Sequence, residues 1–218
     1  MIQPTFSYAR RVTSVLLASG AAFLALHGLI ASALAVPPSP APQPKTASVF
    51  SLDPSSPPQV EFVAIGRPSA LKIKGSGREL LLAITLEKDQ LQGKVDFSLA
   101  SLDTGLSLRD RHMKEKYLEV EKFPKSTFEI LEGTLPAELI SNEAAEAEVI
   151  LKGKLTLHGV TRELNTAAKV KKKGPAYEIQ APLEVKLPDF QIEIPTFAGI
   201  TVAEDVKIDI HFQALTTP

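Results

Sequence analysis

The side chains best suited to acid–base chemistry gather around His112, in a charged stretch near the middle of the chain. Asp103, Asp110 and Glu115 are the nearest carboxylates in sequence, and a histidine beside a carboxylate is a common pair for general acid–base catalysis. Charged helices bring such neighbours together routinely, so the residues are equally consistent with structural roles. Asp110 suits a helix N-terminus, Arg109 could pair with Asp103, and His112 could bond a buried carbonyl. Both interpretations stay open at this point.

The composition indicates which other chemistry to expect. His112, His158 and His211 are the histidines that follow the apolar N-terminal segment, and no two of them have the spacing of metal ligands. His158 precedes a glycine and is typical of a turn, and His211 falls on the polar face of its strand. The chain has no cysteine, which excludes disulfides, thiolate metal sites, a cysteine nucleophile and a lipid-modified N-terminal cysteine. The formal net charge of −1 gives no overall field for nucleic acid or for an anionic membrane. We therefore expect no metal, no cofactor and no nucleic acid.

A strand, a turn and a short helix are expected to position His112. Alternating apolar residues carry a strand up to Asp103-Thr104-Gly105, where a short polar residue, a hydroxyl and a glycine favour a turn. Residues 109–118 then have the spacing of a helix, with opposite charges four residues apart. Pro124 prevents the helix from continuing.

The rest of the chain from Gln59 onward alternates between apolar and polar residues, which is typical of strands that are wet on one side. The predicted strands cover 60–65, 71–75, 80–86, 91–99, 128–132, 149–157, 163–170, 177–187 and 206–212. Eight or nine strands need their edges satisfied, and closure into a barrel is the simplest way, although a two-sheet sandwich would alternate similarly. The predicted fold is all-β and antiparallel, with a short helix after the fourth strand. Pro188–Thr201 interrupts the alternation, and we expect it to pack over a barrel mouth.

The N-terminal region has two parts before this domain. Residues 1–35 resemble a secretory signal, with paired arginines, an apolar run and a small-x-small site that predicts cleavage near Ala35. An uncleaved transmembrane anchor is the alternative, because the apolar run approaches the length that spans a bilayer. Residues 36–58 contain eight prolines and are predicted to be a linker that is dispensable for folding. This leaves 59–218 as the β-barrel domain, with a periplasmic or secreted location.

Three motifs between positions 101 and 128, followed by one downstream, resemble the YceI-like family of small exported lipid-binding proteins. The pattern S-x-D-T-G is followed by R-D-x-H, by F-P-x-x-x-F and then by L-x-L-H-G-V-T. The matching residues are Ser101, Asp103, Thr104, Gly105, Arg109, Asp110, His112, Phe123, Pro124, Phe128, Leu155, Leu157, His158, Gly159, Val160 and Thr161. The first strand lacks the histidine that is common in the family.

The resemblance implies a lipocalin-like barrel of about eight strands that holds a polyisoprenoid chain in its interior. A polar head would sit at the mouth, where Arg109 could hold a phosphate or His112 could bond a quinone oxygen, close to Asp103. The ligand would be an isoprenoid quinone or a polyprenyl lipid, and membrane contact would be transient. The expected lining of the channel is Leu82, Ile84, Gly93, Val95, Phe97, Val149, Leu151, Gly153, Leu155, Ile179, Leu183, Ile208, Ile210 and Phe212.

Two alternatives to a lipid carrier remain at this stage. One is a structural or partner-binding barrel whose core is filled, and the other is a lipid-directed hydrolase that uses His112. Small inward residues bear on the first, because Gly93, Gly153, Ala168 and Ala181 could either leave a channel or mark bends in the barrel. The sequence leaves the oligomeric state undecided, with a dimer among the options.

Overall fold

The computed structural model describes residues 47–68, 71–197 and 199–217. The predicted signal segment and the first part of the predicted linker lie outside these residues. No helix within the described ranges is long and apolar enough to cross a bilayer.

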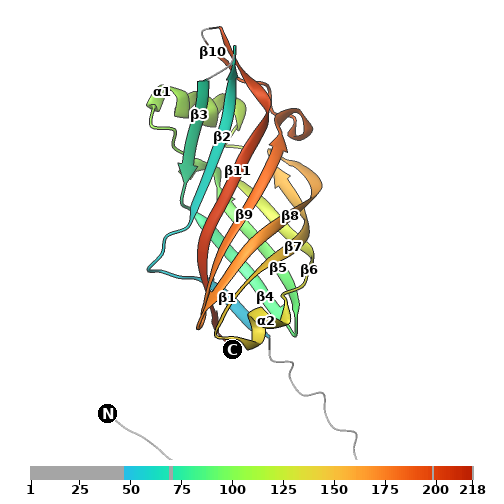
Figure 1. The fold of residues 1–218 in the computed structure, drawn as a ribbon. Coiled ribbons are helices and arrows are strands. Elements are labelled where there is room, and N and C mark those ends of the chain that lie inside the picture. Colours follow the sequence, from blue (N-terminus) through green and yellow to red (C-terminus); the bar gives the residue numbers. More distant parts are fainter. Residues whose placement is uncertain (1–46, 69–70, 198, 218) are drawn as a thin grey trace, which may run out of the picture. The chain divides into compact units, whose positions relative to one another are not determined.

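The described chain is an antiparallel β-structure with a few short helices (Figure 1). The helical elements are η1 (Leu99–Ser101), α1 (Ser107–His112), the π-helical turn η2 (Met113–Tyr117), α2 (Ala137–Ser141) and η3 (Leu187–Phe190). The strands are β1 (Ser48–Leu52), β2 (Gln59–Arg67), β3 (Leu71–Gly77), β4 (Leu80–Glu87), β5 (Gln90–Ser98), β6 (Lys125–Gly133), β7 (Ala144–Leu157), β8 (Val160–Lys173), β9 (Ala176–Lys186), β10 (Thr196–Phe197) and β11 (Ile200–Thr217).

Eight strands close into a barrel, in the order β1-β4-β5-β6-β7-β8-β9-β11, because β11 pairs back onto β1. The edge of β11 is shared between two partners: β1 pairs with positions 214–217, and β2 pairs with positions 201–211. The β2–β3 hairpin therefore extends the wall beyond the closed part of the barrel. Closure pairs the backbone N–H and C=O groups that the edge strands of an open sheet would leave exposed. The predicted antiparallel barrel is confirmed.

The predicted extent of the linker is wrong at its C-terminal end. Residues 48–52 form β1, whose Phe50 is buried with 7% of its surface exposed and packs edge-to-face on Tyr177 at 5.4 Å. The five-residue strand lies between the prolines, so proline content excluded a long strand without excluding this short one. The barrel domain therefore begins at Ser48 within the described residues, and the short helix follows the fifth strand rather than the fourth.

The turn and helix after β5 form where they were predicted. Gly105 has the positive φ of +79° that the turn requires. The helix starts slightly earlier than predicted, at Ser107, and its second half is a single π-helical turn that ends at Tyr117. The hairpin between β7 and β8 turns at His158 and Gly159, both with positive φ, as expected for a two-residue turn.

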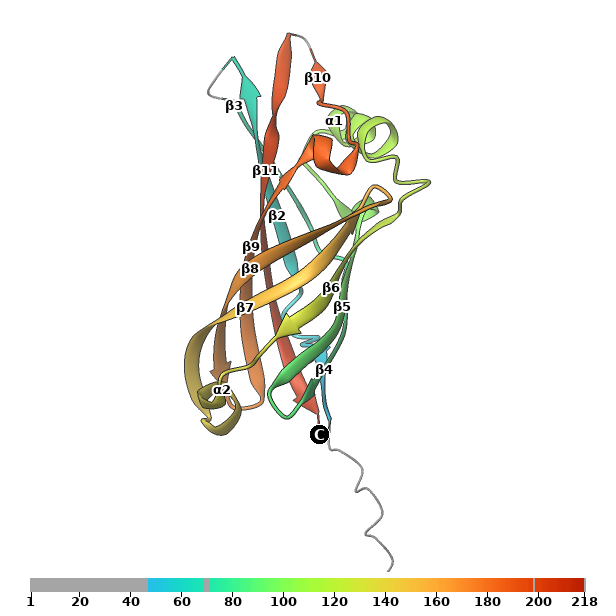
Figure 2. The ribbon, with the colours of Figure 1, turned by 90° about the vertical axis from the view of Figure 1, so that its right-hand side faces the viewer.

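The two ends of the barrel differ. Figure 1 and Figure 2 show α1 and β10 at one end and α2 at the other. At the α2 end, Leu139 is completely buried against a packed cluster that includes Phe50 and Val149, and its carbonyl accepts a hydrogen bond from the Tyr177 hydroxyl. The α2 end is therefore closed by a solid apolar plug.

Candidate functional site

The barrel encloses a cavity of about 670 Å³ between the plug and the α1 end. Inward-facing side chains of the strands form its wall, together with the segment from Thr104 to Leu118 and part of the segment after β9. The predicted packing of Pro188–Thr201 over the mouth is confirmed, because Ile192 and Pro195 belong to this wall. The polar lining residues are Thr104, Ser107, Arg109, His112, Tyr117, Ser126, Thr166 and Thr196.

Most of the residues expected along the channel do face the cavity. The lining includes Ile84, Val95, Phe97, Leu151, Leu155, Ile179, Leu183, Ile208, Ile210 and Phe212. Leu82 instead packs against the plug, and Val149 is buried within it. Period-two alternation identifies the inward face of a strand but does not say which inward residues meet a void and which meet other side chains.

The expectation that Gly93 and Gly153 leave a channel is not what the structure shows. A Cβ added to Gly153 would lie 2.4 Å from the Phe128 ring, so that ring already occupies the space beside the glycine. A Cβ at Gly93 would lie 1.9 Å from the Ala83 carbonyl oxygen, so this glycine permits a close approach of two backbones. Neither glycine lines the cavity. Gly153 instead leaves room for the Phe128 ring, and Gly93 allows the close approach of β5 to β4.

The first hairpin and the helix supply lining residues that were not in the predicted set. β2 and β3 contribute Val60, Phe62, Leu71 and Ile73, and the loop before α1 contributes Leu106. Alternation in the hairpin was visible in the sequence and could have identified its four residues. The position of Leu106 depends on how the turn after β5 folds back over the barrel, for which the sequence gives no periodic signal.

The cavity opens to solvent near α1. The lining residues Leu106, Leu108 and Leu71 are 58%, 48% and 45% exposed, whereas Leu139 at the opposite end is fully buried. An exposed side chain that also lines a cavity marks its opening. The mouth is therefore bordered by β3 on one side and by the start of α1 on the other.

Arg109 and His112 lie in the lining at this mouth, and a network around Thr104 holds the arginine in place. Arg109 Nε donates to the Thr104 hydroxyl at 2.8 Å, and an Nη2 hydrogen bonds the Thr104 carbonyl at 2.7 Å. Arginine has five N–H donors, so these two bonds leave further donors of the guanidinium for other partners. Asp103, in contrast, is exposed and outside the lining, where its carboxylate accepts the Gly105 N–H.

Asp110 supports the same turn. Its Oδ1 accepts both the backbone N–H of Thr104 at 2.8 Å and the Thr104 hydroxyl at 2.5 Å. Burial alone would raise the pKa of Asp110, but the hydrogen bonds from Thr104 outweigh it and hold the pKa below its usual value. Asp110 therefore acts as a charged acceptor that fixes the turn, a structural role that the sequence had left open.

His158, from the downstream motif, joins three segments near the mouth. Its Nδ1 lies 3.2 Å from the Phe190 carbonyl oxygen and its Nε2 lies 3.0 Å from the Glu119 carboxylate, while the Phe123 ring packs edge-on at 4.6 Å. A hydrogen bond from Lys122, with a smaller contribution from His158, holds the pKa of Glu119 below its usual value. His158 is thus a structural junction between the β7–β8 turn, the loop before β6 and η3.

Within the described ranges, no group of three or more histidine, aspartate or glutamate side chains is arranged to hold a metal ion. His211 lies on the exposed outer face, where its Nε2 is 3.2 Å from Glu178. The cavity lining is mostly apolar, with Arg109 and His112 among its polar residues, and is suited to enclosing an apolar molecule.

Comparison with known proteins connects this geometry to a family. A model of the YceI-like domain matches residues 52–214. The protein named YceI from Salmonella arizonae is 30% identical over 115 residues, a match that covers 49% of this chain and 56% of that protein. The match thus spans only about half the length of this relative.

Solved structures share the fold at low sequence identity. A polyisoprenoid-binding domain from Saccharophagus degradans, implicated in plant cell wall breakdown, aligns with a TM-score of 0.62 at 16% identity, covering 78% of this chain and 98% of that one. BcnA from Burkholderia cenocepacia aligns with a TM-score of 0.58 at 18% identity, covering 72% of this chain and 95% of that one. The YCEI protein of Campylobacter jejuni aligns at 0.53 with 19% identity, covering 69% and 88%.

Proposed function

Because the chain belongs to the YceI-like family, we propose that it is an exported protein that holds a long-chain polyisoprenoid or a similar amphiphilic lipid inside its barrel. The observation that carries this proposal is the apolar cavity of about 670 Å³, closed by a plug at one end and open beside Arg109 and His112 at the other. A polyisoprenoid-binding domain with the same fold supports the choice of ligand class.

The energetics of the cavity favour a long chain. Burying one five-carbon prenyl unit stabilises a complex by about 2–4 kcal/mol, whereas association costs roughly 4–15 kcal/mol in lost freedom. Several units must therefore enter the barrel for binding to be firm. A volume near 670 Å³ lies in the range that encloses one such molecule.

The polar groups of the lining suit one end of such a ligand. The Arg109 guanidinium is held by Thr104 and presents donors at the mouth, where a phosphate or a carbonyl oxygen would lie. His112 lies in the same part of the lining and can bond an oxygen of the head group. The apolar tail would then extend toward the plug at the α2 end.

The filled-core barrel and the hydrolase each require a feature that can be compared with this cavity. A barrel with a filled core would have side chains where the cavity lies, so the volume favours the carrier over that alternative. A hydrolase would need a reactive group aligned by His112, and the carboxylate of Asp110 is instead engaged by Thr104. We therefore favour binding over catalysis.

Mass spectrometry of an organic extract tests the proposal. Protein purified without added lipid should yield one class of isoprenoid at a fixed molar ratio. Extracts of a variant with Val95→Trp, which places a large ring in the cavity, should contain much less of it. A lipid-free parent protein that also fails to bind added isoprenoid would contradict the proposal, and turnover of a lipid ester that disappears in His112→Ala would favour the hydrolase.

A further inference from the structure

The rim of the cavity carries apolar side chains that face water. Leu106 and Leu108 at the start of α1, and Leu71 at the start of β3, are each about half exposed and border the opening from both sides. Large exposed apolar side chains that gather in one place mark interaction sites on soluble proteins. Among the large apolar residues of the lining, these three leucines are the most exposed, so they would be the first apolar side chains to meet whatever approaches the mouth.

Cationic side chains surround these leucines. The segments 71–77 and 103–117 together contain six lysines and arginines against three carboxylates, although the whole chain has a net charge of −1. Lys72 and Lys74 alternate with the inward Leu71 and Ile73, so both point to the outside of β3 and are exposed. None of the exposed cations on these two segments forms an ion pair with a described carboxylate.

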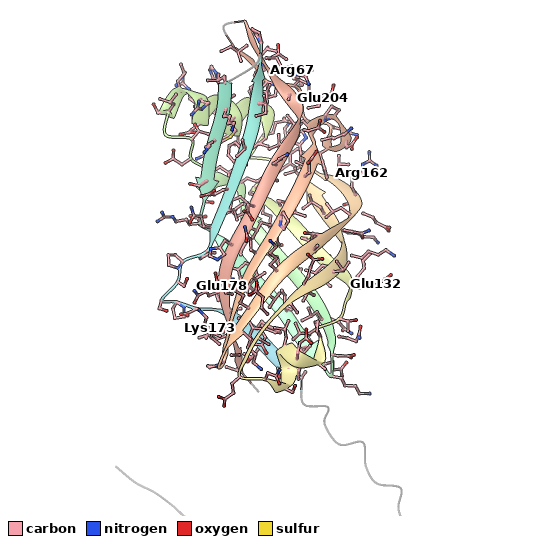
Figure 3. The ribbon with its side chains drawn as sticks, viewed as in Figure 1. Arg67, Glu132, Arg162, Lys173, Glu178 and Glu204 are labelled. Atoms are coloured by element: carbon pink, nitrogen blue, oxygen red, sulfur yellow. The ribbon has the colours of Figure 1, made fainter. Side chains whose placement is uncertain are left out.

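The charge is unevenly distributed around the mouth. Figure 3 shows Arg67 and Glu204 near this end of the barrel, on β2 and β11 respectively. The sheet order β11-β2-β3 places β11 on the far side of β2 from β3, so Glu204 is separated from Lys72 and Lys74 on β3. Lys173, in contrast, is labelled at the opposite end.

We propose that this end of the barrel docks onto the surface of a bilayer that contains anionic phospholipids. Leu71, Leu106 and Leu108 would enter the region between head groups and acyl chains, while the surrounding cations would contact lipid phosphates. A bilayer surface is a partner that offers both environments side by side. The docking surface is argued from the exposed leucines and cations alone, whereas its role in lipid transfer rests on the proposed function. Docking would let the bound lipid move between membrane and cavity without crossing water.

Flotation with two kinds of vesicle tests the electrostatic part. The protein should float with vesicles of phosphatidylcholine and phosphatidylglycerol, much less with phosphatidylcholine alone, and less at high salt. Replacing Lys72 and Lys74 by glutamate should weaken the partition roughly thirtyfold or more, since each cation near such a surface contributes about fivefold. The matched control is Lys171→Glu with Lys173→Glu, an equally spaced pair on β8 at the opposite end, which should leave the partition nearly unchanged.

A single tryptophan tests the apolar part, because the chain has no other. Leu106→Trp should show a blue-shifted emission when anionic vesicles are added. Ile150→Trp is the control, because Ile150 is 59% exposed on the outer wall, nearly the same as Leu106, and should not respond.

The outcomes separate this inference from the proposed function. Equal partition of the wild type and both charge-reversed pairs, or no shift at position 106, would overturn docking at the mouth even if isoprenoid copurifies. Partition that depends on Lys72 and Lys74 in a protein that binds no isoprenoid would support the docking surface and reject the carrier.

Discussion

Val95→Trp examines the central claim that the barrel is hollow. Val95 lies in the middle of β5, lines the cavity, and stands directly opposite Leu82 on β4 and Phe128 on β6. Tryptophan is well tolerated in strands, so the backbone need not change. The indole ring would then extend into the space that we assign to the ligand.

The expected effects on folding and on binding differ in size. An indole that enters a void of about 670 Å³ makes new contacts without displacing neighbours, so the free energy of unfolding should change by less than about 1 kcal/mol. The same ring excludes at least one prenyl unit, whose burial is worth about 2–4 kcal/mol. The dissociation constant for a long-chain isoprenoid should therefore rise by roughly 30-fold to 1000-fold.

Two measurements on one preparation provide the test. Urea denaturation gives the free energy of unfolding, and equilibrium binding of a radiolabelled isoprenoid, which needs no tryptophan, gives the affinity of the wild type and of each variant. Ile150→Trp, on the outer face of β7, should match the wild type in lipid binding. A loss of about 1–3 kcal/mol of stability in Val95→Trp, without a change in lipid binding, would mean that the core was already packed and would refute the reasoning.

Three further predictions concern other parts of the chain. Phe50→Ala should reduce the free energy of unfolding by about 3–5 kcal/mol in urea denaturation, because it removes the ring by which β1 joins the plug. Removal of residues 1–58 should reduce the free energy of unfolding by at least as much. Asp110→Asn should be less stable than the wild type near neutral pH. The difference should shrink as the pH falls through 3.8, the ordinary pKa of the group, and should be lost once the pH is below the lowered pKa of Asp110 in the folded protein. Equal stabilities at pH 7 would contradict the role of Asp110. The intact mass of the exported protein should correspond to a chain that starts directly after Ala35, and retention of the apolar run would contradict cleavage.

The sequence predicted the elements whose pattern is local. Alternation located the strands β2 to β9 and the central part of β11, and Gly105 and Gly159 located turns that need positive φ. The short strand β10 lies in the stretch where the alternation is interrupted. Closure was inferred from the number of strand edges and from the family resemblance. It was not possible to deduce the strand that closes the barrel, because β1 is five residues long and its partners lie far away in the chain.

The candidate site was predictable only in part for a similar reason. Alternation gave the inward face, but the position of the Phe128 ring beside Gly153 depends on the register between β6 and β7. Likewise, the roles of Asp110 and His158 depend on partners that the folded chain brings to them. The Phe190 carbonyl is 32 residues from His158, and the Glu119 carboxylate is 39 residues away.

The pairing of β1 with the end of β11 has a consequence for how the molecule is assembled. The Thr217 hydroxyl and the Val49 carbonyl meet across 168 positions, so closing this seam is the most long-range step in folding and carries a large loop entropy. A chain that crosses a membrane from its N-terminus delivers β1 first and β11 last. The seam can form only after the whole domain has arrived. For the proposed exported carrier, loading with lipid would therefore follow the completion of transport.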